Sequence, residues 1–384
     1  MVSDPKAMID ALLQPWYQAL EDPPTAQRQV LDLLLEGYAQ TDYGARRGAG
    51  QIRSIEEYRT AFPVVTYQDL QPVLRRVMEG DTAALVAEPV EGWALTRGAA
   101  GRESRYIPMT RSDLALRARY SPRALLNYVH RKGRYDILEG YCLIQTSPSE
   151  VGTLKVGDRQ IRYGYSSGLY ARQGAPGAQL RLVPTQDEID ALGSGQTRLD
   201  WERRFDLIYR RAKDKPVTML VGVAQNMLKF GEFCRGRHGV YPKDIWQMSV
   251  LVPTSVAGIL TRYRPALRAL YGDVDLAEMY ATTEAIFAQQ RDERPYVVPN
   301  YDGLLFEAQT RRGMVMLHDM YRGERGSLVV STPILPRYRI GDVVMCYGQP
   351  YFRCLGRERG YHPLRFAFDS FLNSDWESVA LMLR

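Results

Sequence analysis

Three short segments of the chain combine residue types that could bind a phosphate-bearing substrate. Residues 94–110 read ALTRGAAGRESRYIPMT, in which glycines and small residues are surrounded by arginines. Residues 279–287 read MYATTEAIF, and residues 338–344 read YRIGDVV. Backbone N–H groups of a glycine-rich turn and guanidinium groups bind phosphate oxygens, and a carboxylate can hold a hard cation beside them. The three segments therefore indicate a cleft for an anionic ligand.

Each segment taken singly also has an ordinary structural explanation. A glycine-rich loop is commonly a turn, and Thr-Thr-Glu at the end of a strand is commonly a helix cap. Arg-x-Gly-Asp is commonly a turn with a surface ion pair. The order of the three segments and their separations are more specific than any one of them.

In that order the segments resemble the adenylate-forming superfamily of acyl-activating enzymes. Within it, the chain is most similar to the acyl acid amido synthetases of the auxin- and jasmonate-conjugating kind and their bacterial relatives. The run EEYRTAFPVVTYQDL resembles the N-terminal region of that family, and the resemblance continues to FRCLGRERG, over about residues 15–360. It implies an α/β fold, with the layered α/β/α core sheets and β-rich subdomain of the large N-terminal domain. The small C-terminal lid domain is expected to be absent.

The resemblance also implies roles for individual residues. Tyr280 would pack against the adenine of ATP, Thr283 would contact the α-phosphate, Glu284 would hold Mg²⁺ and Asp342 would accept hydrogen bonds from the ribose. Attack of a carboxylate on an α-phosphate brings two anions together, so hydrogen-bond donors and a cation must screen them. The implied substrates are a small carboxylic acid and an amine, with ATP and Mg²⁺ if adenylation is retained. The remaining implied nucleotide-site residues are Thr96, Arg97, Gly98, Gly101 and Arg105 of the phosphate loop, with Thr282 and Arg357.

Three departures from the family pattern leave ATP use open. Alanines and arginines stand in the loop where the family has hydroxyls and a lysine, and arginine is not a neutral replacement for lysine. Residues 252–254 (Val-Pro-Thr) stand where the family usually has a glycine pair. Proline and β-branched side chains should leave less room for the substrate or the adenine to approach the backbone. Residues 361–384 are too few for a lid domain, so either the sequence stops at the hinge of a longer protein or the protein lacks the lid; the amphipathic pattern favours a native terminal helix.

The hydrophobic periodicity predicts the elements that position these segments. Residues 5–38 are expected to form two helices, the second capped by Thr25, and Thr66 is expected to cap a helix that ends at Met78. A strand at residues 94–95 should lead through the loop into one long helix from Thr110 to about Lys132. The expected organisation is a helical region at 1–60, an α/β core at 61–294, a β-rich subdomain at 295–360 and a terminal helix at 361–384.

Composition restricts the class of protein. The 384 residues include 45% apolar and 24% charged side chains, which suits a globular protein with a sizeable core. The net charge is +6, but the arginines are scattered in pairs, so a nucleic-acid tail is not expected. The four cysteines and four histidines show no zinc-ligand spacing. Without an apolar run long enough for a signal peptide or a membrane span, the expected location is the cytoplasm. The oligomeric state stays open.

Three functions remain open at this point. The first is an ATP-dependent enzyme that joins a carboxylic acid to an amine. The second is a remodelled relative that uses the old cleft without ATP, for a cyclisation or acyl transfer, with His318 and Asp319 as a possible acid/base pair. The third is a non-catalytic partner protein. Aromatic residues near the expected pocket would suit a flat or apolar acid: Tyr163, Tyr165, Tyr170, Tyr280 and Phe287.

Overall fold

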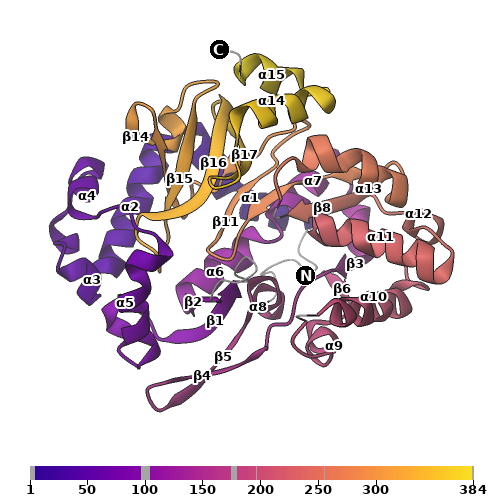
Figure 1. Cartoon of the computed structure of the whole chain (residues 1–384), viewed down its shortest axis with the longest axis horizontal. Helices are drawn as coiled ribbons and strands as arrows, with labels where there is room; N and C mark the ends of the chain where they lie inside the picture. The colour runs from indigo at the N-terminus through magenta and orange to yellow at the C-terminus, as the bar shows by residue number, and fades with distance from the viewer. Residues whose placement is uncertain (1–4, 97–103, 174–179, 196, 255, 383–384) are drawn as a thin grey trace.

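The computed structural model describes residues 5–96, 104–173, 180–195, 197–254 and 256–382. Its described part contains a four-stranded, an eight-stranded and a five-stranded sheet, with helices packed against them (Figure 1). This architecture confirms the expected layered α/β fold with a β-rich part late in the chain.

The N-terminal region is helical, as expected. Asp22, rather than Thr25, caps the second helix, because its side chain accepts a hydrogen bond from the Thr25 backbone N–H at 3.3 Å. Two prolines open that helix, and proline suits a first turn because it needs no N–H partner there. Thr66 caps the helix that ends at Met78, as predicted. The elements are α1 (Pro5–Glu21), α2 (Pro23–Ala39), α3 (Asp42–Ala45), α4 (Ile55–Ala61) and α5 (Tyr67–Met78).

The expected phosphate loop lies between two strands. β1 (Val90–Thr96) pairs antiparallel with β2 (Arg105–Thr110), so that Thr96 lies opposite Arg105. The prediction that the loop leads directly into a helix is therefore wrong. Residues 105–110 contain Tyr, Ile and Thr, which favour a strand, and they pair with buried β1. The sheet is completed by β5 (Arg159–Tyr165), parallel to β1, and β4 (Gly152–Val156).

The single long helix expected after Thr110 is two helices. α6 (Arg111–Tyr120) begins after Thr110, whose side chain accepts a hydrogen bond from the Asp113 N–H at 3.4 Å, as predicted. α7 (Arg123–Lys132) follows Pro122. The break lies at Pro122 because proline lacks the N–H that an uninterrupted helix needs and its ring clashes with the preceding turn.

The eight-stranded sheet forms the α/β/α part of the fold. Its central strands β8, β7 and β3 are parallel, so their carboxyl ends meet at one edge. Helices α10, α11 and α13 lie along one face (Figure 1), and α7 packs against the other. The strands are β3 (Tyr141–Ile144), β6 (Arg181–Val183), β7 (Val217–Val223), β8 (Val250–Thr254), β9 (Asp275–Leu276), β10 (Met279–Ala281), β11 (Ile286–Gln289) and β12 (Val298–Pro299); the helices between them are α8 (Ser166–Gln173), α9 (Gln186–Asp190), α10 (Arg198–Ala212), α11 (Ala224–His238), α12 (Pro242–Ile245) and α13 (Arg264–Tyr271).

The last part of the chain is an antiparallel sheet in the order β14-β13-β15-β16-β17. The terminal segment contains two short helices rather than the single helix expected. They are attached to β17 because the Arg353 guanidinium binds the Asp375 carboxylate and donates to the Ser378 hydroxyl at 3.1 Å. The elements are β13 (Leu305–Thr310), β14 (Gly313–Met316), β15 (Arg325–Ser331), β16 (Tyr338–Gly348), β17 (Tyr351–Arg357), α14 (Pro363–Leu372) and α15 (Trp376–Met382).

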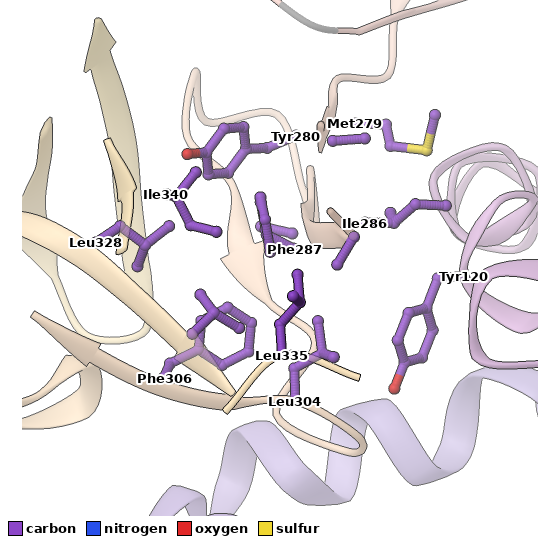
Figure 2. Packing of buried hydrophobic residues seen from close by; sticks show 14 of the residues in the cluster. Tyr120, Met279, Tyr280, Ile286, Phe287, Leu304, Phe306, Leu328, Leu335 and Ile340 are labelled. Carbon is purple, nitrogen blue, oxygen red and sulfur yellow. The ribbon is translucent and has the colours of Figure 1, made fainter. Parts of the chain in front are cut away.

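A shared apolar core fixes the eight-stranded and five-stranded sheets to each other. Figure 2 shows Tyr280 of β10 and Phe287 of β11 close together, with Ile340 of β16 beside Tyr280 and Leu328 of the five-stranded sheet next to Ile340. Phe287 and Phe306 are fully buried. Because this core joins β10 to β16, it sets the position of the MYATTEAIF segment relative to YRIGDVV. Among the residues described, no helix is both long and apolar enough to cross a membrane.

Candidate active site

One large cavity collects the predicted site residues. Its volume is about 1630 Å³, and its walls come from the carboxyl ends of β3, β7 and β8, the turn after β10, and strands β16 and β17. Parallel strands place the residues that follow them at one edge of a sheet, so this location follows from the topology. All predicted residues in the described ranges line the cavity: Thr96, Arg105, Tyr280, Thr282, Thr283, Glu284, Asp342 and Arg357. Arg97, Gly98 and Gly101 lie outside the described residues.

Residues 282–285 form a tight turn that presents Glu284. The Thr282 N–H donates to the Ala285 carbonyl at 2.9 Å. The Thr282 hydroxyl accepts from the Glu284 N–H at 3.2 Å and donates to Glu284 Oε2 at 2.7 Å. The turn leads into strand β11, so the alternative explanation of this segment as a helix cap is wrong. Glu284 is 6% exposed and its carboxylate is oriented by a neighbouring side chain.

Asp342 is held by two partners from other strands. The Tyr280 hydroxyl donates to Asp342 Oδ2 at 2.6 Å, and Arg357 Nε lies 3.1 Å from Oδ1. Burial raises the pKa of Asp342, and the Arg357 charge and the Tyr280 hydrogen bond oppose this effect. Each carboxylate oxygen has two lone pairs and can accept a further hydrogen bond. Asp342 is therefore fixed in position and can still accept a hydrogen bond from a ligand hydroxyl.

Positive side chains outnumber carboxylates in the described lining. Burial alone would lower the pKa of Arg357, but the nearby carboxylates of Asp342 and Glu284 raise it above its ordinary value. Arg105 lies over the Tyr67 ring at 5.2 Å from its centre. An excess of cations in a concave site attracts anions. The charged residues of the described lining are Arg105, Arg262, Arg339, Arg357 and Arg359, against Glu284, Asp342 and Glu358.

The residues present fit Mg²⁺ if a nucleotide supplies most of its ligands. The described residues contain no group of three or more acidic, histidine or cysteine side chains that could hold a metal ion. Mg²⁺ in nucleotide sites is commonly bound by one or two carboxylates together with substrate phosphates and water. Glu284 supplies one such carboxylate in the cavity wall. The site therefore suits a cation that arrives with a phosphate ligand.

Arg117 of α6 does not line the cavity but holds the 282–285 turn, and the sequence analysis did not single it out. Its Nη1 donates to the Thr283 carbonyl at 2.9 Å, and its Nη2 donates to the Glu284 carbonyl. Nε donates to Asp113 Oδ2 at 2.5 Å, and the ion pair is almost fully buried. Asp113 and Arg117 are four residues apart on one helix, which is a spacing for ion pairs. The spacing could have predicted the ion pair between Asp113 and Arg117. Nothing in the nearby sequence indicated that Arg117 also binds the Thr283 and Glu284 carbonyls.

We expect Arg117→Met to lower the free energy of unfolding by about 3–5 kcal/mol, because it leaves the buried Asp113 carboxylate without its counter-charge. Urea unfolding of the purified variant measures this change. Arg111→Met, in the exposed first turn of the same helix, is the control and should change stability by less than about 0.5 kcal/mol. Equal small losses for both variants would show that Arg117 does not brace the 282–285 turn.

The part of the cavity formed by the strand ends is mostly apolar. Val252 and Thr254 are part of its lining, where the family pattern would place glycine, while Pro253 is not. Of the aromatic residues expected near the pocket, Tyr170 and Tyr280 line it, whereas Tyr163, Tyr165 and Phe287 do not. The remaining apolar wall includes Leu125, Ile144, Leu180, Leu182, Val221, Val256, Met279 and Ile286.

His318 and Asp319 lie away from the cavity. They belong to a short helical turn after β14, and the His318 ring packs edge-on against Tyr301 at 6.0 Å between ring centres. Burial lowers the pKa of His318, and Asp319 opposes this effect. Neither residue is part of the cavity lining. The geometry gives this pair no access to a ligand in the cavity.

Comparison with known proteins gives consistent matches. Residues 13–157 match the GH3 family N-terminal domain. Over 106 residues, which are 26% of this chain and 17% of the relative, the chain is 31% identical to indole-3-acetic acid-amido synthetase GH3.6 of Arabidopsis thaliana. Over 383 residues it is 24% identical to the probable indole-3-acetic acid-amido synthetase GH3.1 of the same plant. That alignment covers 84% of this chain but only 64% of the relative.

Solved structures share the fold. The AtGH3.15 acyl acid amido synthetase in complex with 2,4-DB is similar with a TM-score of 0.72 at 18% identity, over 92% of this chain and 71% of that chain. An open conformation of 2-hydroxyisobutyryl-CoA ligase in complex with 2-HIB-AMP and CoA is similar with a TM-score of 0.59 at 14% identity, over 86% and 73% of the two chains. At these identities the likeness establishes the fold alone.

Proposed function

We propose that this protein is an acid–amine ligase, because residues 13–157 match the GH3 family N-terminal domain and the chain has the fold of the adenylate-forming enzymes. It would activate a small carboxylic acid with ATP and Mg²⁺ as an acyl-adenylate and transfer the acyl group to an amine. The chain spans about two thirds of the length of the GH3.1 relative, so this proposal concerns the activity to which the described cavity contributes.

The observation that carries the proposal is the convergence of three separate segments on one cavity. Thr96 and Arg105 flank the glycine-rich loop, Glu284 lies in the turn after β10, and Asp342 lies in β16. The strand-end wall of the same cavity is apolar, which suits the body of an organic acid. A cavity with a charged region beside an apolar region suits a reaction between a nucleotide phosphate and the carboxylate of an organic acid.

Each residue can be given a task in adenylation. Glu284 would hold Mg²⁺, which when bound supplies positive charge to the nucleotide phosphates. Thr283 and Arg105 would donate hydrogen bonds to the α-phosphate, where charge develops as the acid attacks. Asp342 would accept from the ribose hydroxyls, held in place by Tyr280 and Arg357. Thr282 would orient Glu284 through the 2.7 Å hydrogen bond.

We expect ATP to exchange label with pyrophosphate only when a suitable carboxylic acid is present, because adenylation is reversible and needs no amine. A panel of aromatic and aliphatic acids with Mg²⁺, read by mass spectrometry, tests this expectation. Isothermal titration with ATP and Mg²⁺ is the companion measurement. Absence of nucleotide binding at millimolar concentration would exclude the proposal whatever the acid.

A ligase is favoured over the two other functions left open by the sequence. The acid/base pair suggested for an ATP-independent reaction lies outside the cavity. The relatives are named as amido synthetases, and a fold neighbour was solved with an acyl-AMP compound, 2-HIB-AMP. A purely structural role would not require a cavity in which buried Glu284 and Asp342 share the wall with arginines.

A further inference from the structure

Gln145 is a buried amide side chain in the cavity wall. It follows the last residue of β3, and its backbone N–H donates to the Val221 carbonyl of β7 at 3.0 Å. The residue is 3% exposed and belongs to the cavity lining. Its backbone is therefore fixed by the sheet, at the edge where the parallel strands end.

Neither polar atom of this side chain has a hydrogen-bond partner among the described residues. Both Oε1 and Nε2 are buried without one. Leaving a buried donor or acceptor unpaired destabilises the folded protein, so such groups are normally satisfied. An amide that retains this cost in a cavity wall is placed to bind a group that enters the cavity.

The polar side chain that follows Gln145 in the chain has a partner, in contrast to Gln145. The Thr146 hydroxyl donates to the Gln186 side-chain oxygen at 2.7 Å, and the Gln186 amide donates to Asp190 at 2.9 Å. Asp190 also accepts from the Ser149 backbone N–H at 2.7 Å. These side chains are paired with one another, and none of them is a partner of the Gln145 amide.

A glycine provides the space that Gln145 occupies. A Cβ atom added to Gly222 would lie 2.9 Å from Gln145 Cβ and 3.2 Å from Oε1. Contacts this short do not occur without displacement of a neighbour, so any side chain at position 222 would move Gln145. The nearby cavity wall formed by Ile144, Leu182 and Val221 is apolar and offers a ligand no competing hydrogen bond.

Building on the proposed function, we propose that Gln145 determines which acid is accepted. The substrate would be a carboxylic acid with an apolar body that carries one hydrogen-bonding substituent, such as a hydroxyl or a ring N–H. The amide can donate and accept at once, so either kind of group satisfies it. An acid lacking the substituent would leave the amide buried and unpaired, and a site built for a hydrogen bond discriminates against such analogues.

The test compares matched pairs of acids, hydroxybenzoic with benzoic acid and indole- with naphthalene-carboxylic acid. We expect the unaltered protein to prefer the polar member of one pair by about tenfold or more in kcat/KM for exchange, equivalent to about 1.4 kcal/mol. Gln145→Met should abolish the preference by slowing only the polar member. Gly222→Ala should do the same with Gln145 intact. Gln160→Met, on the exposed surface of β5, is the control.

Two results would overturn the proposal. One is a preference that is unchanged in Gln145→Met, and the other is the absence of any preference in the unaltered protein among acids that exchange. Failure of the ligase proposal can be told apart from failure of the Gln145 proposal, because in that case no acid would support pyrophosphate exchange. In that case the shift in melting temperature with each acid still reports whether Gln145→Met removes the preference in binding.

Discussion

Replacing Glu284 with glutamine is expected to reduce acid-dependent pyrophosphate exchange by a factor on the order of 10³. The substitution keeps the size of the side chain and a hydrogen-bond acceptor for Thr282, but removes the negative charge that would hold Mg²⁺. Without the cation, the acid carboxylate and the α-phosphate would approach each other with their charges less screened. Exchange with the best acid of the panel measures the loss.

A second measurement separates cation binding from general damage. Isothermal titration of Glu284→Gln with ATP should show weaker binding in the presence of Mg²⁺, while the melting temperature without ligand stays close to that of the unaltered protein. The matched control is Glu79→Gln, an exposed carboxylate at the end of α5, which should leave both quantities unchanged. If Glu284→Gln exchanges label at the normal rate, Glu284 is not the residue that holds the cation.

The sequence predicted the parts of this molecule that depend on local patterns. Thr66 as a cap, β1 before the loop and the order of the three site segments all follow from residues close in the chain. The resemblance to the family then placed Glu284 and Asp342 in one cavity, where the structure has both. Local propensity and motif order suffice for such features because neighbouring residues decide them.

The errors arose where one local signal outweighed another. Thr25 is a good capping residue, but the two prolines start the helix earlier and leave Asp22 as the cap. The capping signal of Thr110, with Asp113 three residues on, suggested one long helix, although Pro122 breaks it. The strand β2 was missed because its Tyr and Ile signal is short and interrupted by Pro108, and its pairing with β1 is not evident from the local sequence.

Other features depend on tertiary contacts and had no sequence signal. Arg117 is 166 residues from the Thr283 carbonyl that it binds. The unpaired state of Gln145 is evident only when every neighbour within hydrogen-bond distance is known. A single sequence contains the side chains but not these distances, so positioning residues are harder to predict than motif residues.

Replacing Glu307 of β13 with glutamine is expected to lower the free energy of unfolding by about 3–5 kcal/mol. Its carboxylate is buried and accepts from Arg337 Nε at 2.9 Å and Nη2 at 3.1 Å, while Arg59 Nε donates to Oε1 at 2.8 Å. Glutamine keeps the shape but leaves the two guanidinium groups close together without a counter-charge. The cluster joins α4 to the start of β16, so the position of the cavity strand depends on it.

Arg337 shows how strongly this cluster holds the backbone. Its φ is 41°, in the left-handed region that costs a non-glycine residue about 1–2 kcal/mol, and its Nη1 donates to the Arg59 and Phe62 carbonyls. The guanidinium bonds offset that cost only while Glu307 holds the group in place. Chemical unfolding of Glu307→Gln measures the loss, and Glu202→Gln in the exposed Arg198 pair is the matched control, expected to change stability by at most about 1 kcal/mol. If the two variants lose equal stability, the two ion pairs of Glu307 only offset the cost of burying its charge, and the cluster does not fix the start of β16.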